Sequence, residues 1–283
     1  MKNVSAMLGV LLLLIVTACD VIDNPVQQGG VPPPDTSADF KQNVLLEDYT
    51  GHTCGNCPEA ADVAHQIQSA YGDDRVIVVA VHSGPFARTN QSYPTDWRTP
   101  EGTEMDNTFR ISMAGNPNGL VNRTERSGKF ILSKDDWAPA TVDLLDNDPA
   151  LGIELEKTWN AENKTISVTA RLTFLKEGTT DYHIVGWIIE NGLVGDQLDY
   201  RKSPSHIEDF EFEHVLRASV NGTWGEPVLT ETQAAGTVKS WPMQFTFPSE
   251  KDWKPENCDL VVFVHKHNTT KEVVQVVKTK IVD

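Results

Sequence analysis

Apolar runs separated by polar, turn-forming stretches divide this chain into two segments with different patterns. Residues 43–149 alternate between strand-like and helix-like patterns, beginning with an apolar run over 44–49 and a helical pattern over 58–71. The continuous apolar run from Val76 to Val81 is typical of a strand buried on both faces. The remaining elements that we expect in this segment are a short helix over 103–113, strands over 120–122 and 129–132, and a helix that Ser133 caps and that ends near residue 145.

From about residue 150 the pattern changes to short strands with turn residues between them. Ile166, Val168, Ala170 and Leu172 alternate with more polar neighbours, which indicates a strand with one buried face. Within this second segment, only residues 208–218 have a pattern that indicates a less extended conformation than a strand. Short strands at this spacing favour an immunoglobulin-like β-sandwich. We expect strands over residues 152–159, 165–175, 183–190, 240–247, 260–267 and 272–281, the last two joined by a turn at 268–271.

The first nineteen residues have the pattern of a signal peptide. Lys2 precedes an apolar run over residues 6–18, which is shorter than the ~20 residues of a membrane-spanning helix. The run ends in Val-Thr-Ala-Cys19, which resembles the bacterial lipobox and implies that Cys19 is lipidated and becomes the mature N-terminus. An ordinary secretory peptide is the alternative. Residues 20–42, rich in Gly and Pro, indicate a flexible tether.

Charge and cysteine usage narrow the function classes. The formal net charge of −16 argues against nucleic-acid binding, which needs a basic stripe, and against electrostatic docking onto anionic lipid. An exported chain meets an oxidising or redox-managed compartment, where disulfides persist. Cys258, at the head of an apolar strand, is interpreted as a half-buried small hydrophobe, and its pairing with another cysteine stays an open alternative.

Cys54 and Cys57 form a Cys-Gly-Asn-Cys motif at a junction between a predicted strand and a predicted helix. Unpaired N–H groups and the macrodipole at a helix N-terminus stabilise a thiolate there. In such motifs the thiol pKa falls to roughly 3.5–7.5, so that one thiol attacks at neutral pH. The spacing therefore indicates thioredoxin-type redox chemistry.

Several sequence blocks carry a resemblance to a known family. The whole chain resembles the 28-kilodalton outer-membrane lipoprotein family of Gram-negative bacteria, which joins a thioredoxin-like domain to an immunoglobulin-like one. The resemblance implies a thioredoxin-like domain over 43–149, an immunoglobulin-like β-sandwich domain over 150–283 and an outer-membrane location. The blocks are Thr50–Pro58, His82-Ser83-Gly84, Asn116–Arg123, His214–Arg217 and Gly222–Glu226.

The thioredoxin resemblance also implies roles for individual residues. Cys54 would be the exposed nucleophile, and Cys57 would resolve the mixed disulfide. Pro117 matches the cis-proline that faces the motif. Asp48 matches the buried acid that relays a proton to the second thiol; the alternative is a strand-end carboxylate that reaches water. Thr53 departs from the family pattern because it replaces a tryptophan.

Other candidates give weaker signals. His52, beside the motif, either favours the thiolate or is an exposed loop residue without a role. The added segment 83–102 either shapes a substrate groove or is neutral. His82 either contacts substrate or is a histidine satisfied by the backbone, and the second interpretation is favoured. His265 and His267 share a strand face, but no further ligand lies at metal spacing, and a solvent-facing strand is favoured.

Two functions follow. The first is an envelope lipoprotein that exchanges disulfides with protein thiols through Cys54 and Cys57, anchored to the membrane by lipid on Cys19. The second is a surface or periplasmic binding protein that uses both domains as a scaffold and holds a static Cys54–Cys57 disulfide. Neither requires a cofactor, a metal or nucleic acid. Asp20 conflicts with an outer-membrane anchor under some bacterial sorting rules.

Overall fold

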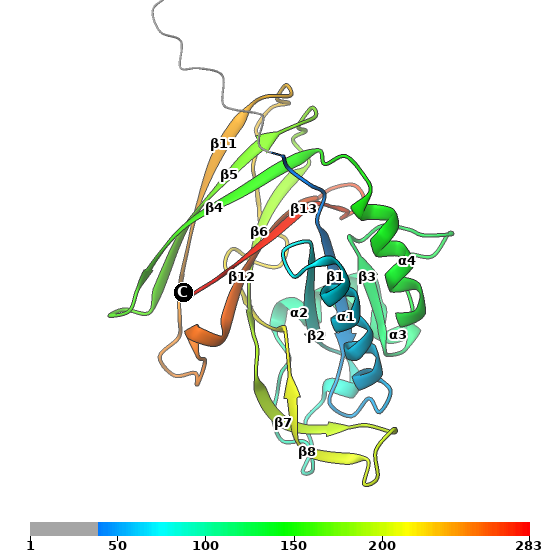
Figure 1. The fold of residues 1–283 in the computed structure, drawn as a ribbon. Helices are drawn as coiled ribbons and strands as arrows, with labels where there is room; N and C mark the ends of the chain where they lie inside the picture. The colour runs from blue at the N-terminus through cyan, green and yellow to red at the C-terminus, as the bar shows by residue number, and fades with distance from the viewer. Residues whose placement is uncertain (1–38) are drawn as a thin grey trace, which may run out of the picture. The chain divides into compact units, whose positions relative to one another are not determined.

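The computed structural model describes residues 39–283 of the chain (Figure 1). The predicted signal peptide, the predicted lipidation site Cys19 and most of the predicted tether lie outside the described residues. The described part is a mixed α/β structure that consists mostly of strands. Its first elements are β1 (Val44–Thr50), α1 (Cys57–Tyr71), β2 (Val76–His82), the 3₁₀ turn η1 (Pro85–Ala87), α2 (Pro100–Phe109), α3 (Ile111–Ala114), β3 (Asn118–Val121) and α4 (Lys134–Leu145).

The second half of the described chain contains the remaining strands and one short 3₁₀ turn. All six strands predicted in this half are confirmed, with bounds that differ by at most two residues. The elements are β4 (Leu151–Asn160), β5 (Thr165–Phe174), β6 (Tyr182–Glu190), β7 (Leu193–Leu198), β8 (His206–Phe212), β9 (Val215–Ser219), β10 (Glu226–Pro227), β11 (Val238–Thr246), η2 (Pro255–Asn257), β12 (Cys258–Lys266) and β13 (Val273–Lys280).

One large sheet contains strands from both predicted domains. Its order is β13-β12-β6-β9-β2-β1-β3, with β10 added beside β6. β1 and β2 are parallel, and β3 pairs with β1 in the antiparallel direction. The link between the halves is the parallel pairing of β2 with β9, in which Ala80 lies opposite Val215 and the Ala80 N–H donates to the His214 carbonyl at 2.8 Å.

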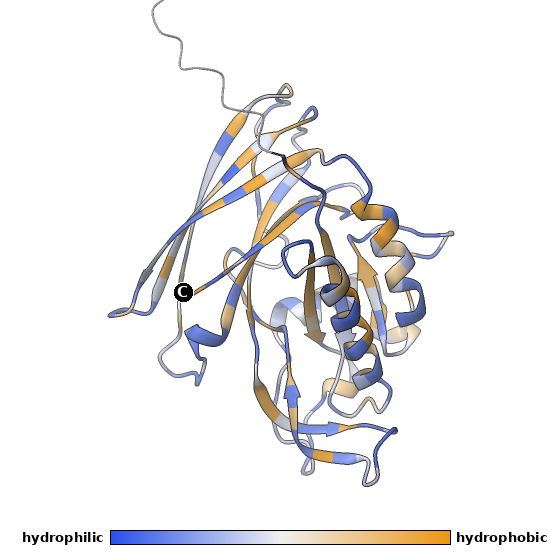
Figure 2. Cartoon of the chain, viewed as in Figure 1, coloured by the Kyte–Doolittle hydropathy of each residue, from blue (hydrophilic) through white to orange (hydrophobic). Residues whose placement is uncertain are grey.

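Both faces of this sheet are buried, which explains its continuous apolar runs. On one face α1 and α4 pack over β1 and β2 around Leu46, Ala64 and Trp137. On the other face one core contains Leu45 and Val79 from the first half together with apolar residues from β6 and β12. Figure 2 shows β1 and β2 largely in orange, whereas α1 mixes hydrophilic and paler turns.

A buried ion pair lies within the second of these cores. The Arg123 guanidinium donates to Glu47 through Nε at 2.8 Å and Nη2 at 3.0 Å, and both side chains are fully buried. The rings of Phe109 and Phe263 each lie 5.3 Å from the Arg123 Cζ atom. This bidentate pair therefore joins β1 to the segment after β3 inside an aromatic shell.

β4, β5 and β11 form a separate three-stranded sheet that packs on the far end of the large sheet (Figure 1). Ile184 and Ile188 of β6 face this sheet, whereas Val185 and Trp187 face the opposite core. The alternation follows from the two-residue period of a strand. β6 therefore has a buried face in each of two cores.

Three parts of the predicted secondary structure are wrong. The helix expected over 103–113 is broken at Arg110, whose φ of 60° is left-handed, so that it becomes α2 and α3. Residues 129–132 form only isolated bridges to Gly119 and Arg126 rather than a strand. Residues 208–218, expected to be less extended, lie in β8 and β9. The hairpin formed by β7 and β8 was not predicted at all.

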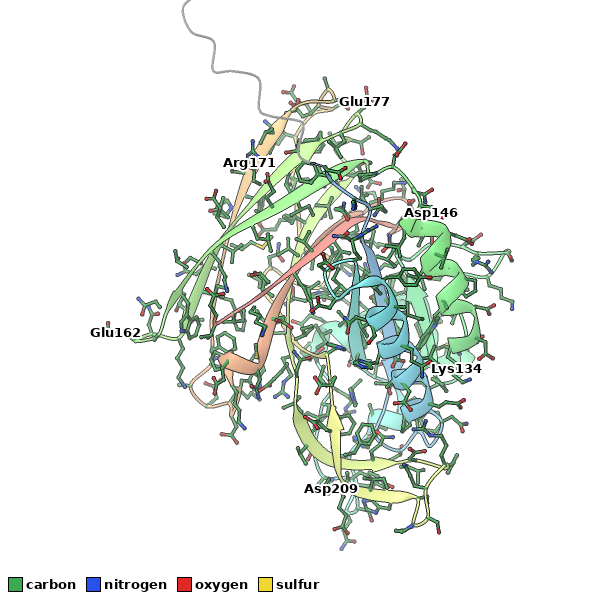
Figure 3. All side chains as sticks on the ribbon, viewed as in Figure 1. Lys134, Asp146, Glu162, Arg171, Glu177 and Asp209 are labelled. Carbon is green, nitrogen blue, oxygen red and sulfur yellow. A yellow bond between two sulfur atoms is a disulfide. The ribbon has the colours of Figure 1, made fainter. Side chains whose placement is uncertain are left out.

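The charged side chains labelled in Figure 3, among them Lys134, Arg171 and Asp209, lie at the periphery of the described part. Asp135 and Asp136 lie in the first turn of α4, where their negative charges interact favourably with the positive end of the helix dipole. Among residues 39–283, none of the helices has the length and apolar content that crossing a membrane requires.

Candidate functional site

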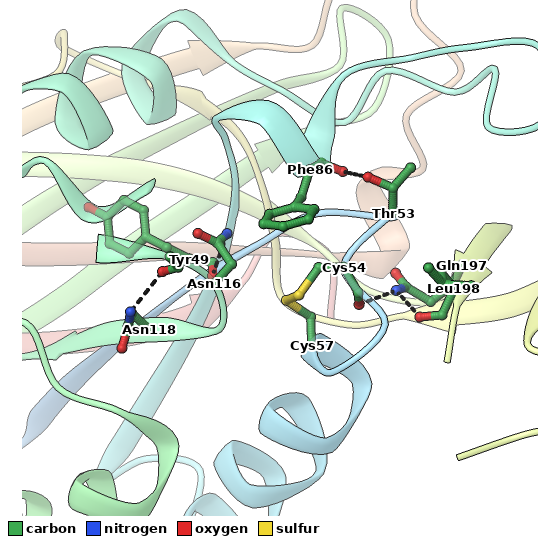
Figure 4. The surroundings of a disulfide bond; sticks show 10 residues. Tyr49, Thr53, Cys54, Cys57, Phe86, Asn116, Asn118, Gln197 and Leu198 are labelled. Atoms are coloured by element: carbon green, nitrogen blue, oxygen red, sulfur yellow. Dashed lines mark hydrogen bonds between the residues drawn. A yellow bond between two sulfur atoms is a disulfide. The ribbon is translucent and has the colours of Figure 1, made fainter. Parts of the chain in front are cut away.

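The motif cysteines lie where β1 passes into α1, and they form a disulfide. Cys57 is the first residue of α1, and Pro58 follows it in the first turn, where its missing N–H costs no helical hydrogen bond. The Cys57 N–H donates to the Cys54 carbonyl at 3.1 Å. Strand, turn and helix thus hold both sulfur atoms in place (Figure 4).

Both cysteines are buried, which corrects one expectation. Cys54 is only 3% exposed and Cys57 only 1% exposed, so Cys54 is not the exposed nucleophile that the resemblance implied. The cover comes from the hairpin β7–β8, about 140 residues further along the chain. Gln197 of β7 donates from Nε2 to the Cys54 carbonyl at 3.2 Å, beside the disulfide in Figure 4.

The hairpin makes further contacts with the motif loop. The Leu198 N–H donates to the His52 carbonyl at 2.8 Å, and the Tyr200 N–H donates to the Gly55 carbonyl at 2.9 Å. The ring of Tyr200 lies so close that a Cβ atom at Gly55 would come within 2.6 Å of it. Sequence reasoning missed these residues because no local pattern signals a contact between chain segments this far apart.

The added segment 83–102 packs against the opposite side of the motif loop. Thr53 donates to the Phe86 carbonyl through its N–H at 3.0 Å and its Oγ1 at 2.9 Å. The Phe86 ring lies beside the disulfide in Figure 4. His52 is 1% exposed, and its Nε2 lies 3.0 Å from the Arg88 carbonyl, so the expectation of an exposed loop histidine is wrong.

The loop before β3 also reaches the site. The Asn116–Pro117 peptide bond is cis, as the resemblance predicted for Pro117. The Asn116 Nδ2 donates to the Tyr49 carbonyl at 3.1 Å, which fixes this loop to the end of β1. The disulfide and the proline loop therefore both attach to the C-terminal end of β1.

A cavity of about 280 Å³ lies beneath the disulfide, between α1, the sheet and the hairpin. Cys57 and Asp48 both line it. Asp48 is 2% exposed, and its Oδ1 has no hydrogen-bond partner among residues 39–283, so the alternative of a carboxylate that reaches water is wrong. Burial raises the pKa of Asp48 from 3.8 to about 7. Near neutral pH this carboxyl group both accepts and releases a proton.

His82, at the end of β2, lines the same cavity. It was interpreted as satisfied by the backbone, but neither ring nitrogen has a hydrogen-bond partner within the described part of the chain. Burial lowers its pKa to about 3, which keeps the ring neutral at physiological pH. Its ring packs edge-on against Phe212, with centroids 5.4 Å apart.

The other candidate residues lie away from this site. Cys258 is a buried free thiol, in line with its interpretation as a small hydrophobe, and burial raises its pKa. His265 is fully buried, with Nε2 3.0 Å from the Trp224 carbonyl, so the expected solvent-facing strand is wrong. His267 stacks on His183 at 3.9 Å. No group of metal-binding side chains in the described part is arranged to hold a metal.

Comparison with protein families identifies the chain. The model of the outer membrane protein Omp28 family matches residues 104–283, well over half of the sequence. The chain belongs to this family. Membership indicates an association with the cell envelope or outer membrane. The matched region begins after the Cys54–Cys57 motif, so the family match itself does not include the disulfide. A search of the curated proteins found no match.

Solved structures resemble the chain in fold. HBP35 of Porphyromonas gingivalis is 16% identical with a TM-score of 0.62, over 85% of this chain and 76% of that one. A protein of Agrobacterium tumefaciens is 12% identical with a TM-score of 0.51, over 85% of this chain and 95% of that one. A domain of the outer membrane lipoprotein Omp28 from P. gingivalis is 22% identical over 47% of this chain and 89% of that one, with a TM-score of 0.31. At these identities the first two describe the fold alone.

Proposed function

We propose that this Omp28-family protein is a lipid-anchored envelope protein that exchanges disulfides with protein thiols through Cys54 and Cys57. The observation that carries the proposal is the cavity shared by Cys57 and Asp48, which pairs a helix-terminal cysteine with a buried acid titrating near pH 7. A buried carboxyl group of this kind accepts the proton that the second thiol must lose. A disulfide that serves only as a brace needs no such group.

The arrangement of the elements around the motif supports the assignment of a thioredoxin-like fold to residues 43–149. β1 and β2 are parallel, β3 is antiparallel and follows a cis-proline, and α1 and α4 pack on one face. In the second half, two packed sheets with an alternating core support an immunoglobulin-like sandwich.

In the proposed reaction the reduced protein transfers two electrons to a substrate disulfide. The Cys54 thiolate attacks one substrate sulfur and releases the other as a thiolate. Cys57 then gives its proton to Asp48 and attacks the Cys54 sulfur, which forms the internal disulfide and releases the second substrate sulfur. The released thiolates take up protons, so the protein dithiol becomes a disulfide and the substrate a dithiol.

The test is the reduction potential of the Cys54–Cys57 pair and the insulin-reductase activity of the full chain, with Cys54→Ser as the inactive control. We expect turnover and a potential above about −300 mV, the range of exchanging pairs. A potential well below about −300 mV without turnover would sink the proposal. Trapping a mixed disulfide with Cys57→Ser would identify natural substrates.

A second function is favoured by the burial of the disulfide. Both sulfur-bearing side chains are almost inaccessible, and three hydrogen bonds from the hairpin hold the motif loop closed. A static brace within a binding protein has these properties. The two functions differ in whether a small thiol such as dithiothreitol reduces the pair in the folded protein.

The proposed anchor is tested separately from the chemistry. Acyl chains on Cys19 would hold the protein on the outer membrane, since two or more chains give stable anchoring where one is marginal. We expect Cys19→Ser to release the protein in soluble form while wild type fractionates with membranes. Membrane fractionation of the variant equal to that of wild type would remove the lipoprotein assignment.

A further inference from the structure

The proposed disulfide exchange leaves a proton inside a cavity. When the Cys57 thiol ionises, Asp48 accepts its proton, and both groups are at least 98% buried. With a pKa of about 7, Asp48 is already protonated in part of the molecules near neutral pH, and there it must lose that proton before it accepts the one from Cys57. Asp48 is 2% exposed, so its proton leaves through the cavity that this carboxyl group lines, and a second group on the cavity wall can serve as the carrier.

The ring nitrogens of His82 have the unpaired hydrogen-bonding positions that such a carrier needs. It is 2% exposed, and neither Nδ1 nor Nε2 finds a hydrogen-bond partner among residues 39–283. A buried imidazole without partners is costly to keep in a fold. Both nitrogens are therefore available to groups or water within the cavity that this ring lines with Asp48 and Cys57.

The sheet register brings the two side chains to the same wall. His82 is the register partner of Thr50 across the parallel pair β1–β2, and Asp48 lies two residues before Thr50. The two-residue period of a strand directs Asp48 and Thr50 to one face, and both line the cavity with His82. Both side chains therefore face the same cavity, where water can connect them. A cavity of about 280 Å³ has room for that water.

We propose that His82 is a positioning residue that acts through Asp48, relaying the Cys57 proton between the buried carboxyl group and the outside of the cavity. The neutral ring accepts a proton at one nitrogen while it releases the proton on the other. The ring therefore ends each transfer neutral, and one proton has moved from Asp48 towards bulk water. The inference rests on the proposed exchange reaction, whose electron balance it leaves unchanged.

The surroundings of His82 keep it neutral between transfers. Burial is the main reason for its low pKa, the nearby His52 and Arg217 lower it further, and Asp96 opposes them. A ring that is neutral throughout the working pH range has one donor and one acceptor nitrogen. Besides Cys57, the titratable groups that face it or line its cavity are Asp48 on β1, Asp62 and His65 on α1, His52 and Asp96 in the loops, Glu211 on β8, Glu213 and His214 after β8, and Arg217 on β9.

The experiment isolates the step in which Cys57 loses its proton. The reduced full chain is mixed with 5,5′-dithiobis(2-nitrobenzoic acid) in a stopped-flow instrument. Attack by Cys54 releases one thionitrobenzoate, and attack by Cys57 on the mixed disulfide releases a second. The rate of the second release is followed from about pH 5 to about pH 9, which spans the pKa values on which proton transfer depends. The variants are His82→Phe, His82→Gln, Asp48→Asn and Thr50→Val.

We expect His82→Phe and Asp48→Asn each to slow the second release by at least about tenfold and to flatten its pH dependence. The double variant His82→Phe/Asp48→Asn should give a second release no slower than that of Asp48→Asn alone, because both residues serve one proton path. Thr50→Val changes the same cavity wall without removing a titratable group, so its rate should stay within about twofold of wild type. The first release should keep its rate in every variant.

His82→Gln separates proton relay from packing, and it also serves if His82→Phe does not fold. Glutamine donates and accepts hydrogen bonds, but it does not exchange protons between its ends. A wild-type pH profile in His82→Gln or His82→Phe would overturn the relay while the exchange reaction stands. Wild type that gives no second release would overturn the proposed function and the relay with it.

Discussion

Glu47 and Arg123 form a bidentate ion pair in which neither side chain is exposed to solvent. Arg123→Met would leave the Glu47 carboxylate buried without its partner. We expect a loss of about 3–5 kcal/mol in the free energy of unfolding. Urea denaturation of the oxidised protein measures it.

Two variants test this explanation. Arg123→Lys keeps the charge but not the planar fork, and we expect an intermediate loss because an ammonium group cannot make both hydrogen bonds in the same geometry. The matched control is Arg171→Met, which breaks a half-exposed pair with Glu154 and should cost less than about 1 kcal/mol. Equal losses for Arg123→Met and Arg171→Met would contradict the role of burial.

Asp48 makes stability depend on pH. Its pKa rises from 3.8 to about 7 on folding, because burial disfavours the charged form. Between these values the folded chain holds a proton that the unfolded chain has released, so its contribution to stability falls as pH rises from about 4 to about 7 and is level above that. Asp48→Asn removes this dependence.

We therefore expect Asp48→Asn to gain stability relative to wild type over this window, by about 1.4 kcal/mol for each pH unit. Urea denaturation at several pH values gives the difference. Asp62→Asn, an exposed carboxylate at the edge of the same cavity, is the control and should show no such slope. A stability difference between Asp48→Asn and wild type that does not vary with pH would refute the assignment of the buried acid.

The hairpin β7–β8 should limit access to the disulfide. Arg201 ties the hairpin to α1 through its Nη1, 2.6 Å from Asp62 Oδ2. Exposed pairs of this kind contribute up to about 1 kcal/mol, so Asp62→Ala, which breaks this pair and leaves the bonds between Arg201 and Asp199, should speed reduction of the disulfide by dithiothreitol up to about fivefold. The rate of reduction is measured from the change in tryptophan fluorescence or by titrating the protein thiols that form.

Arg126→Ala is the matched control for the hairpin experiment, because it breaks the exposed pair with Asp143 on α4. Its reduction rate should equal that of wild type. If both variants accelerate reduction equally, then general destabilisation rather than opening of the hairpin controls access.

Two glycines in one loop should differ in their tolerance of a side chain. Gly222 and Gly225 both have positive φ, at 83° and 66°. A Cβ atom at Gly225 would lie 2.0 Å from the Ile184 carbonyl oxygen, whereas none of the described atoms lies within 4 Å of one at Gly222. Gly222→Ala should cost about 1–2 kcal/mol for its backbone conformation alone. Gly225→Ala should cost at least about 1–3 kcal/mol more, measured by thermal unfolding, and equal costs would contradict the contact.

Much of the secondary structure could be predicted from the chain because its signals are local. The run over β2 and the alternation over β5 show directly in the sequence, and the helix α1 follows its motif. β7 and β8 gave no such signal, since Gly195 interrupts the first and acidic residues the second. Their conformation depends on the contacts that they make with the motif loop and with each other.

The site was predictable in its residues but not in its environment. Cys54, Cys57, Pro117 and Asp48 follow from the motif and from the resemblance, and the structure gathers them around the end of β1 and the start of α1. Their burial depends on Gln197 and its neighbours in the hairpin, which sequence spacing does not connect to the motif. The free nitrogens of His82 likewise depend on which groups surround the ring, a property of tertiary packing.

The pairing of β2 with β9 governs when the chain can complete its fold. The core around Leu45 and Val79 also requires Phe263 on β12 and Val276 on β13, close to the C-terminus. During synthesis or export, the apolar face of β1 and β2 therefore stays open to water until nearly the whole chain has emerged. Such long-range closure slows folding and exposes the chain to aggregation.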